Sequence, residues 1–308
     1  MSARTLRCIV SIIGALALVI TWTLTTAAIS AASTPGSKSY VAMGDSFSAG
    51  TGAGNTPLPG IGQTPEDIAT YGDTFFGCNR SANAYPVQLA TTHGYQLTNV
   101  TCSGATIENI LVTGQSGEPA QITALSENTN LVTLTIGGND IGFLGIIICV
   151  LTSECNEYSP AIMEANAALG TIGDELTAML TAITTVAPNA DVVMGGYPRL
   201  LPAPGQPIGE GCWGWLSAAE QQLIYELQLQ LNETLRSAAS SQGITFVNAM
   251  APASPFERTD ALSQSLDACA VSDQRLINEL RSWYYPGLFH PNALGQDAYA
   301  ELFTRAVA

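Results

Sequence analysis

The chain has 308 residues and a formal net charge of −15 at pH 7, and 46% of its residues are hydrophobic while only 11% are charged. This length is enough for one substantial domain with a large core. So acidic a chain is a poor candidate for binding nucleic acids or anionic membranes, because both attract basic proteins. We therefore expect no nucleic-acid partner.

Residues 1–32 have the organisation of a secretory signal peptide that is cleaved. Two arginines precede an apolar run over residues 8–24, and the small residues Ala31 and Ala32 offer a cleavage site. A retained membrane anchor is the alternative, although the run is borderline in length for spanning a bilayer. We expect residues 33–308 to form a single domain of a secreted, extracellular protein without stable membrane anchoring.

The cysteines agree with an oxidising compartment. Six of the seven follow the predicted signal peptide, and an even number in that context indicates disulfides. Their spacing alone does not select the pairs. A zinc site is the competing interpretation, but the chain has no C-x-x-C pair and only two histidines, His93 and His290. The six cysteines are Cys78, Cys102, Cys149, Cys155, Cys212 and Cys269.

The first predicted strand is the apolar run Tyr40–Met43, which breaks at Gly44-Asp45-Ser46. Glycine and aspartate are common in turns, and the residues that follow Ser46 are mostly small. A serine in this position presents its hydroxyl and its backbone N–H to a cleft, as nucleophilic acyl chemistry requires. A structural turn without chemistry is the alternative, and the choice between the two interpretations depends on the rest of the sequence.

A long surface loop is predicted next, because residues 51–82 are rich in Gly, Thr, Pro and Asn. A short helix with Asn83 as its cap follows over residues 83–92. His93, at the end of this helix, is expected to be a surface or capping residue and not a catalytic one.

Two further predicted strands end in groups that suit a developing negative charge. Residues 95–101 lead into Gly104, whose unobstructed N–H would lie near a helix start. Residues 130–136 are the clearest central strand, and the amide of Asn139 follows them directly. Asp140 is expected to cap a helix that begins at residue 141.

The second half of the chain alternates between helical and strand patterns. Because strands alternate with helices, the fold class is α/β with a mainly parallel five-stranded sheet. Ser46, Gly104 and Asn139 each follow a strand, so they should meet at the carboxyl edge of that sheet. Helices are predicted over residues 160–186, 217–240 (with Ser217 and Glu220 as a capping box) and 272–282, strands over 191–195 and 244–247, and a loop with Trp213 and Trp215 over 196–215.

His290 directly precedes Pro291-Asn292, which predicts the start of the last helix. This placement holds an imidazole on a rigid loop, as a general base requires. A packed histidine at a helix entry is the alternative.

These segments together resemble a known family. The Gly-Asp-Ser turn at 44–46, Gly104, the Gly-Gly-Asn-Asp segment at 137–140 and His290 with its Pro-Asn are similar to the four ordered blocks of the SGNH (GDSL-type) hydrolases. The six cysteines, the Thr-Cys-Ser-Gly-Ala-Thr segment and the acidic character resemble the secreted actinobacterial lipases and esterases of that family. The likeness covers most of the chain after the predicted signal peptide.

The resemblance implies a flavodoxin-like, three-layer α/β/α sandwich. It makes Ser46 the nucleophile and His290 the general base, with an oxyanion hole formed by the N–H groups of Ser46 and Gly104 and the side chain of Asn139. It also implies the sequential disulfides Cys78–Cys102, Cys149–Cys155 and Cys212–Cys269. No metal or organic cofactor is expected, and the protein is expected to be a monomer.

One position departs from the family pattern. Many members carry an aspartate three residues before the histidine, where this chain has Gly287. We therefore predict a Ser–His dyad in which a backbone carbonyl, that of Gly287, orients His290, while Asp45 braces the nucleophile turn. A distant Asp or Glu that completes a triad is the alternative.

The function that the resemblance implies is hydrolysis of carboxylic esters of lipids or of other acyl esters. A polysaccharide O-deacetylase is the first alternative, which an open polar groove would favour and an apolar pocket would oppose. A non-catalytic secreted binding module is the second.

Overall fold

The computed structural model describes residues 37–54, 77–152, 155–212, 216–260, 265–271, 273–279 and 287–307. The predictions for the signal peptide, for most of the loop at 51–82 and for Trp213 and Trp215 lie outside these residues. The chain from Pro35 onward forms one compact unit.

A five-stranded, all-parallel sheet with the order β2-β1-β3-β4-β5 forms the centre of this unit. In the pair β1–β3, Met43 lies opposite Leu134. Every residue of β3 is buried, because helices cover both faces of a parallel sheet. The strands are β1 (Ser39–Gly44), β2 (Gln96–Asn99), β3 (Leu131–Thr135), β4 (Asp191–Gly195) and β5 (Thr245–Val247), which confirms the predicted strands.

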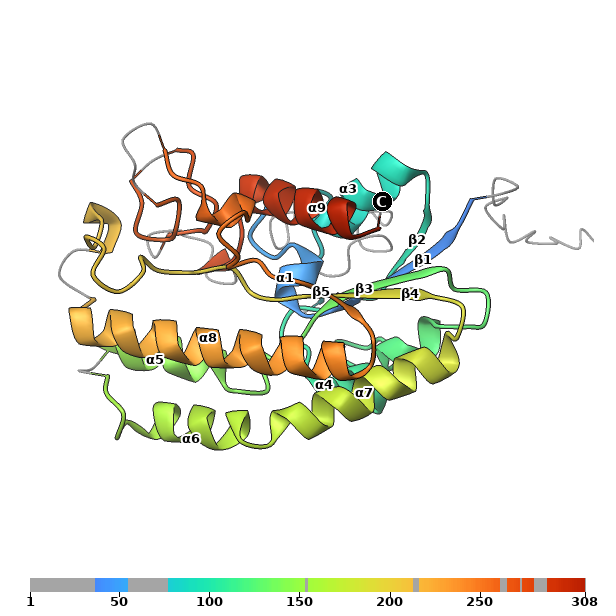
Figure 1. The fold of residues 1–308 in the computed structure, drawn as a ribbon, viewed down its shortest axis with the longest axis horizontal. Coiled ribbons are helices and arrows are strands. Elements are labelled where there is room, and N and C mark those ends of the chain that lie inside the picture. Colours follow the sequence, from blue (N-terminus) through green and yellow to red (C-terminus); the bar gives the residue numbers. More distant parts are fainter. Residues whose placement is uncertain are drawn as a thin grey trace, which may run out of the picture. The chain divides into compact units, whose positions relative to one another are not determined.

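Helices form a layer on each side of the sheet (Figure 1). Helices α3 (Tyr85–His93) and α9 (Ala293–Val307) lie together on one face, and α4 (Ile107–Leu111), α7 (Ile172–Val186) and α8 (Ala218–Ser241) lie on the other. The expected three-layer α/β/α architecture is confirmed, and the strand order is the flavodoxin-like one. The remaining helices of the described residues are α1 (Ser46–Ala49), α5 (Phe143–Thr152), α6 (Pro160–Leu169) and the 3₁₀ turns η1 (Gln121–Ala124), η2 (Glu210–Cys212) and η3 (Pro255–Glu257).

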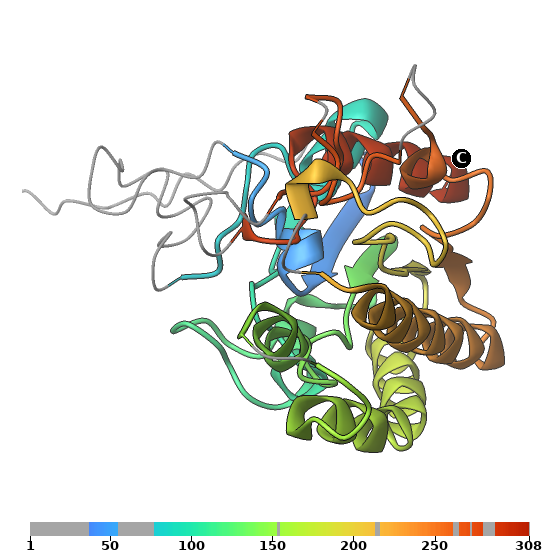
Figure 2. The same cartoon turned by 90° about the vertical axis from the view of Figure 1, so that its left-hand side faces the viewer.

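The connections reverse direction between β1 and β3, because β1 leads outward to β2 and the chain then returns to β3. In open parallel sheets, ligands bind at this point, beyond the carboxyl ends of the strands. Figure 2 faces this edge, where α1 follows β1. The fold therefore places the residues after β1 and β3 at the expected site.

Two helix predictions were wrong in their details. The single helix at 160–186 is divided into α6 and α7 at Gly170-Thr171, where glycine has a low helix propensity and Thr171 is the N-cap of α7. Asn83 does not cap α3. The N-cap is Ala84, and the amide of Asn83 instead donates to the carbonyl of Ala53 at 2.8 Å.

The predicted helix at 272–282 was also wrong over its described residues, 273–279, which contain no helix. Their backbone groups pair with the loop that carries His290. The N–H of Asn278 donates to the carbonyl of His290 at 2.9 Å, and the N–H of Asn292 donates to the carbonyl of Leu276 at 3.0 Å. This pairing replaces the bonds that a helix would make within itself.

Candidate active site

Ser46 is the first residue of α1, and only Asp45 separates it from Gly44, the last residue of β1. Gly44, where the chain turns, has φ +115°, and a Cβ there would lie 2.3 Å from the carbonyl oxygen of Thr135 on the neighbouring strand. Only glycine fits so close an approach in this conformation. The turn therefore ends β1 abruptly and places the Ser46 side chain at the carboxyl edge of the sheet.

The carboxylate of Asp45 holds this turn in place, as expected. It accepts hydrogen bonds from the N–H of Phe47 at 3.0 Å, from Oγ1 of Thr135 at 2.7 Å and from the hydroxyl of Tyr197. Burial raises the pKa of Asp45 to about 6, and these three hydrogen bonds oppose the shift. Because the Tyr197 hydroxyl also accepts from the N–H of Gly138 at 2.9 Å, Asp45 links the turns after β1 and β3.

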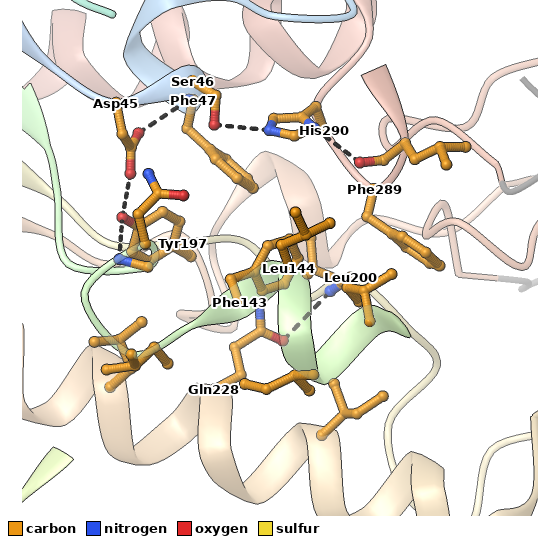
Figure 3. Close-up of a pocket in the computed structure, with 18 of the residues that line it drawn as sticks. Asp45, Ser46, Phe47, Phe143, Leu144, Tyr197, Leu200, Gln228, Phe289 and His290 are labelled. Carbon is orange, nitrogen blue, oxygen red and sulfur yellow. Dashed lines mark hydrogen bonds between the residues drawn. The ribbon is translucent and has the colours of Figure 1, made fainter. Parts of the chain in front are cut away.

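His290 makes two hydrogen bonds that define its tautomer. Its Nε2 lies 2.7 Å from Oγ of Ser46, and its Nδ1 lies 2.8 Å from the carbonyl oxygen of Leu288. Because a carbonyl oxygen only accepts, we assign the ring proton to Nδ1. Nε2 is then free to accept the proton of the serine hydroxyl (Figure 3).

The orienting carbonyl is therefore that of Leu288, and the prediction of Gly287 was wrong. The Gly287 carbonyl instead accepts the backbone N–H of His290 at 3.2 Å. The cause is Phe289, whose φ of +57° is uncommon for a bulky residue and redirects the carbonyl that precedes it. Phenylalanine rarely adopts a left-handed backbone, so the sequence does not indicate that the Leu288 carbonyl would replace that of Gly287.

The surroundings of His290 favour its neutral form. Burial lowers the pKa of His290 to about 4, and the hydrogen bond to the Leu288 carbonyl opposes that shift. Across the described ranges, no carboxylate is hydrogen-bonded to the imidazole. At neutral pH the ring is therefore uncharged and able to accept a proton.

Gly104 and Asn139 line the same pocket as Ser46 and His290. Within the described part of the chain, the backbone N–H groups of Ser46 and Gly104 have no acceptor. The Asn139 amide donates one hydrogen to the carbonyl of Ala105 at 2.9 Å, which leaves its second hydrogen for a ligand. The structure thus brings together the four residues that the sequence singled out.

Asp140 has a different role from the predicted one. Helix α5 begins at Phe143, and Asp140 Oδ1 accepts the N–H of Ile107 at the start of α4, at 3.0 Å. The carboxylate therefore joins the loop that carries Asn139 to the helix that follows Gly104. Sequence reasoning missed this link because it depends on two segments that are distant in the chain.

Three disulfides join the pairs that the resemblance implied, Cys78–Cys102, Cys149–Cys155 and Cys212–Cys269. Cys102 lies two residues before Gly104, so its bond anchors the loop of that glycine. Cys149 lies on α5, so its bond ties the second half of this helix to the following loop.

A cavity of about 270 Å³ extends from Ser46 and His290 between helices α5 and α8. Figure 3 shows Phe143 and Leu144 across the cavity from the paired serine and histidine. Its walls are mostly apolar and include Phe143, Leu144, Ile147, Ile148 and Leu151 from α5 and Ile224, Leu227 and Leu231 from α8, while Gln228 of α8 and Tyr197 add polar groups. Residues 141–150 are apolar in the sequence, but the sequence does not show that this segment faces the site.

A model of the GDSL-like lipase/acylhydrolase family matches residues 42–298. The chain belongs to this family. It is 32% identical to Lipase 2 of Streptomyces coelicolor over 310 residues, which cover 97% of this chain and 95% of the relative. It is 36% identical to Lipase 1 of the same organism over 209 residues, which cover 67% of this chain and 68% of the relative.

Two solved structures of Streptomyces enzymes agree with the fold. An extracellular lipase from Streptomyces rimosus superposes with a TM-score of 0.67 at 26% identity, covering 88% of this chain and 100% of that one. A phospholipase A1 from Streptomyces albidoflavus superposes with a TM-score of 0.66 at 28% identity, covering 87% and 99%. The GDSL-family protein described here is accordingly a carboxylic ester hydrolase of the lipase/esterase type. None of the helices in its described ranges is long and apolar enough to cross a membrane.

Proposed function

We propose that the protein is a secreted serine esterase that acts on lipid esters through a Ser–His dyad. One observation carries this proposal. The Ser46 hydroxyl is hydrogen-bonded to a neutral imidazole at 2.7 Å, and both groups line an apolar cavity large enough for part of an acyl chain.

In the first half of the reaction, Oγ of Ser46 attacks the ester carbonyl carbon while Nε2 of His290 accepts its proton. The carbonyl oxygen becomes an oxyanion, which would receive hydrogen bonds from the N–H groups of Ser46 and Gly104 and from the Asn139 amide. The imidazolium then gives its proton to the departing alcohol, which leaves an acyl group on Ser46. In the second half, water attacks that ester with His290 again as the base, and the acid is released.

The Leu288 carbonyl takes over one task of the missing acid. It fixes the tautomer and the ring orientation of His290 through Nδ1. A carboxylate would also stabilise the imidazolium, which an uncharged carbonyl does less well. The absence of a hydrogen-bonded carboxylate in the described ranges supports the dyad over a triad completed by a distant acid.

The walls of the cavity distinguish between substrate classes. Aliphatic and aromatic side chains of α5 and α8 bind hydrocarbon well and offer little to a sugar ring, whose hydroxyl groups need polar partners. This lining supports an acyl lipid substrate over a polysaccharide O-deacetylase. The pairing of Ser46 with His290 opposes a non-catalytic binding module.

Secretion is part of the proposal. The basic and then apolar segment at 1–32 is typical of a cleaved signal peptide, and three disulfides suit an oxidising compartment. The S. rimosus relative, which is described as extracellular, supports the same location.

The test is hydrolysis of p-nitrophenyl esters with acyl chains from two to sixteen carbons by the wild type and by Ser46→Ala. We expect turnover by the wild type, with a preference for chains longer than acetyl, and none by the variant. Equal rates for both proteins would refute the nucleophile assignment. Turnover of acetyl esters alone would refute the lipid substrate and favour a deacetylase.

A further inference from the structure

Helix α5 exposes apolar side chains at the rim of the cavity. Leu144 is 57% exposed and Ile148 is 45% exposed, although both also line the cavity that holds Ser46. The two residues are four positions apart on one helix, so they lie next to each other on the same face. The cavity and the outer surface therefore share one continuous apolar strip, which we call the α5 rim.

The α5 rim contains no charged side chain to oppose contact with hydrocarbon. The helix reads Phe-Leu-Gly-Ile-Ile-Ile-Cys-Val-Leu-Thr, and its residues Ile146, Ile147 and Val150 are buried. An exposed apolar strip that continues into a ligand cavity is a candidate surface for contact with a protein or a lipid. The continuity with the cavity distinguishes the α5 rim from the other exposed apolar side chains of the described residues.

We propose that the α5 rim docks the protein on the surface of aggregated lipid, so that an acyl chain passes from the aggregate into the cavity without crossing water. This deepens the proposed function, because it names the physical form of the substrate. The continuity of the rim with the cavity argues for this occupant. A second copy of the chain or another protein seated on Leu144 and Ile148 would cover the entrance that substrate needs.

The charge of the chain restricts the kind of lipid surface. With a net charge of −15, the protein is repelled by an anionic surface, whereas a neutral or zwitterionic one leaves apolar contact to act alone. The partner is therefore a zwitterionic or uncharged lipid surface, and adding anionic lipid should weaken binding.

The experiment measures binding of Ser46→Ala protein to phosphatidylcholine vesicles by co-sedimentation, so that no lipid is hydrolysed. In this background, Leu144→Gln combined with Ile148→Gln should lower the partition coefficient about tenfold, since each side chain has roughly half of its surface left to bury. The matched control combines Leu229→Gln with Val186→Gln, at positions 42% and 39% exposed on α8 and α7 and away from the cavity. The control should change binding less than twofold.

Equal loss in both double variants, or wild-type binding by the Leu144 and Ile148 variant, would overturn the proposal. Stronger binding to vesicles that contain phosphatidylglycerol would overturn the choice of lipid. If the double variant does not reach the wild-type melting temperature, Leu144→Gln alone carries the test with an expected threefold loss. Vesicle binding does not depend on turnover, so the two proposals fail separately. Unchanged vesicle binding by the Leu144 and Ile148 double variant, beside normal turnover by the wild type, refutes only the docking surface. Turnover by Ser46→Ala refutes only the nucleophile assignment.

Discussion

Removal of the Asn139 amide tests the oxyanion hole most directly. One of its two hydrogens is already bound to the carbonyl of Ala105 at 2.9 Å, so only the other can reach an oxyanion. The proposed hole has three donors, and loss of one such donor costs about 2.7–4 kcal/mol of transition-state stabilisation, or about 10²–10³ in rate. We expect Asn139→Ala to lower kcat/KM for p-nitrophenyl butyrate by that factor.

The same substitution also leaves the Ala105 carbonyl without its partner, which costs about 1 kcal/mol of stability. For a chain of this size, that lowers the melting temperature by only about 2–4 °C, so rates measured at 25 °C report chemistry rather than unfolding. Asn189→Ala is the matched control, because the Asn189 amide also donates to a backbone carbonyl, that of Glu127, at 2.9 Å but away from the site. Retention of kcat/KM within threefold in Asn139→Ala would refute the reasoning.

Three further predictions follow from the structure. First, kcat/KM should fall as the pH drops through about 4, where burial places the pKa of His290. A limb near 6.5 that persists in Asp45→Asn, and so does not come from the Asp45 carboxyl, would show a fully solvated imidazole. Because that folded-state pKa is depressed, the stability that His290 contributes should also decrease as the pH falls from 6.5 toward 4. Second, Gly44→Ala should lower the free energy of unfolding, measured in urea, by more than ~3 kcal/mol, because its Cβ would lie 2.3 Å from a carbonyl oxygen of β3. Gly205→Ala, at a position with φ +80° and open space around it, should lower the free energy of unfolding by only about 1–2 kcal/mol. Third, Leu227→Phe should narrow the cavity and move the preferred acyl chain of the p-nitrophenyl series to a shorter length, whereas Leu223→Phe, on the same helix but outside the cavity, should leave the profile unchanged.

The sequence predicted the chemistry of the site because each group stands at a locally marked position. Ser46 follows a strand and a glycine turn, Asn139 follows a central strand, and His290 precedes the Pro-Asn pair that leads into the last helix. In a parallel α/β sheet these local features are enough, since all strand ends meet at one edge. The fold class and the convergence of the four residues could therefore be predicted before any coordinates.

The features that escaped prediction depend on contacts between distant segments. The choice of Leu288 over Gly287 rests on a left-handed backbone at Phe289, whose N–H donates to the carbonyl of Asn278 in the segment 273–279, outside the loop. The walls of the cavity come from α5 and α8, and nothing in their residue patterns states which apolar face meets the other. Such arrangements are decided by packing, for which local sequence carries little information.

The apolar environment of His290 has two opposed consequences for a dyad. It lowers the pKa of the imidazole to about 4, which keeps the base neutral over a wide pH range. It also makes the imidazolium of the transition state costly, and the Leu288 carbonyl offers no negative charge to offset that cost. The remaining source of stabilisation is the oxyanion itself, which forms beside the imidazolium and is drawn into the hole by three donors. A dyad in so apolar a site should therefore depend more steeply on its oxyanion donors than a triad does, so the loss in Asn139→Ala should lie toward the upper end, near 10³.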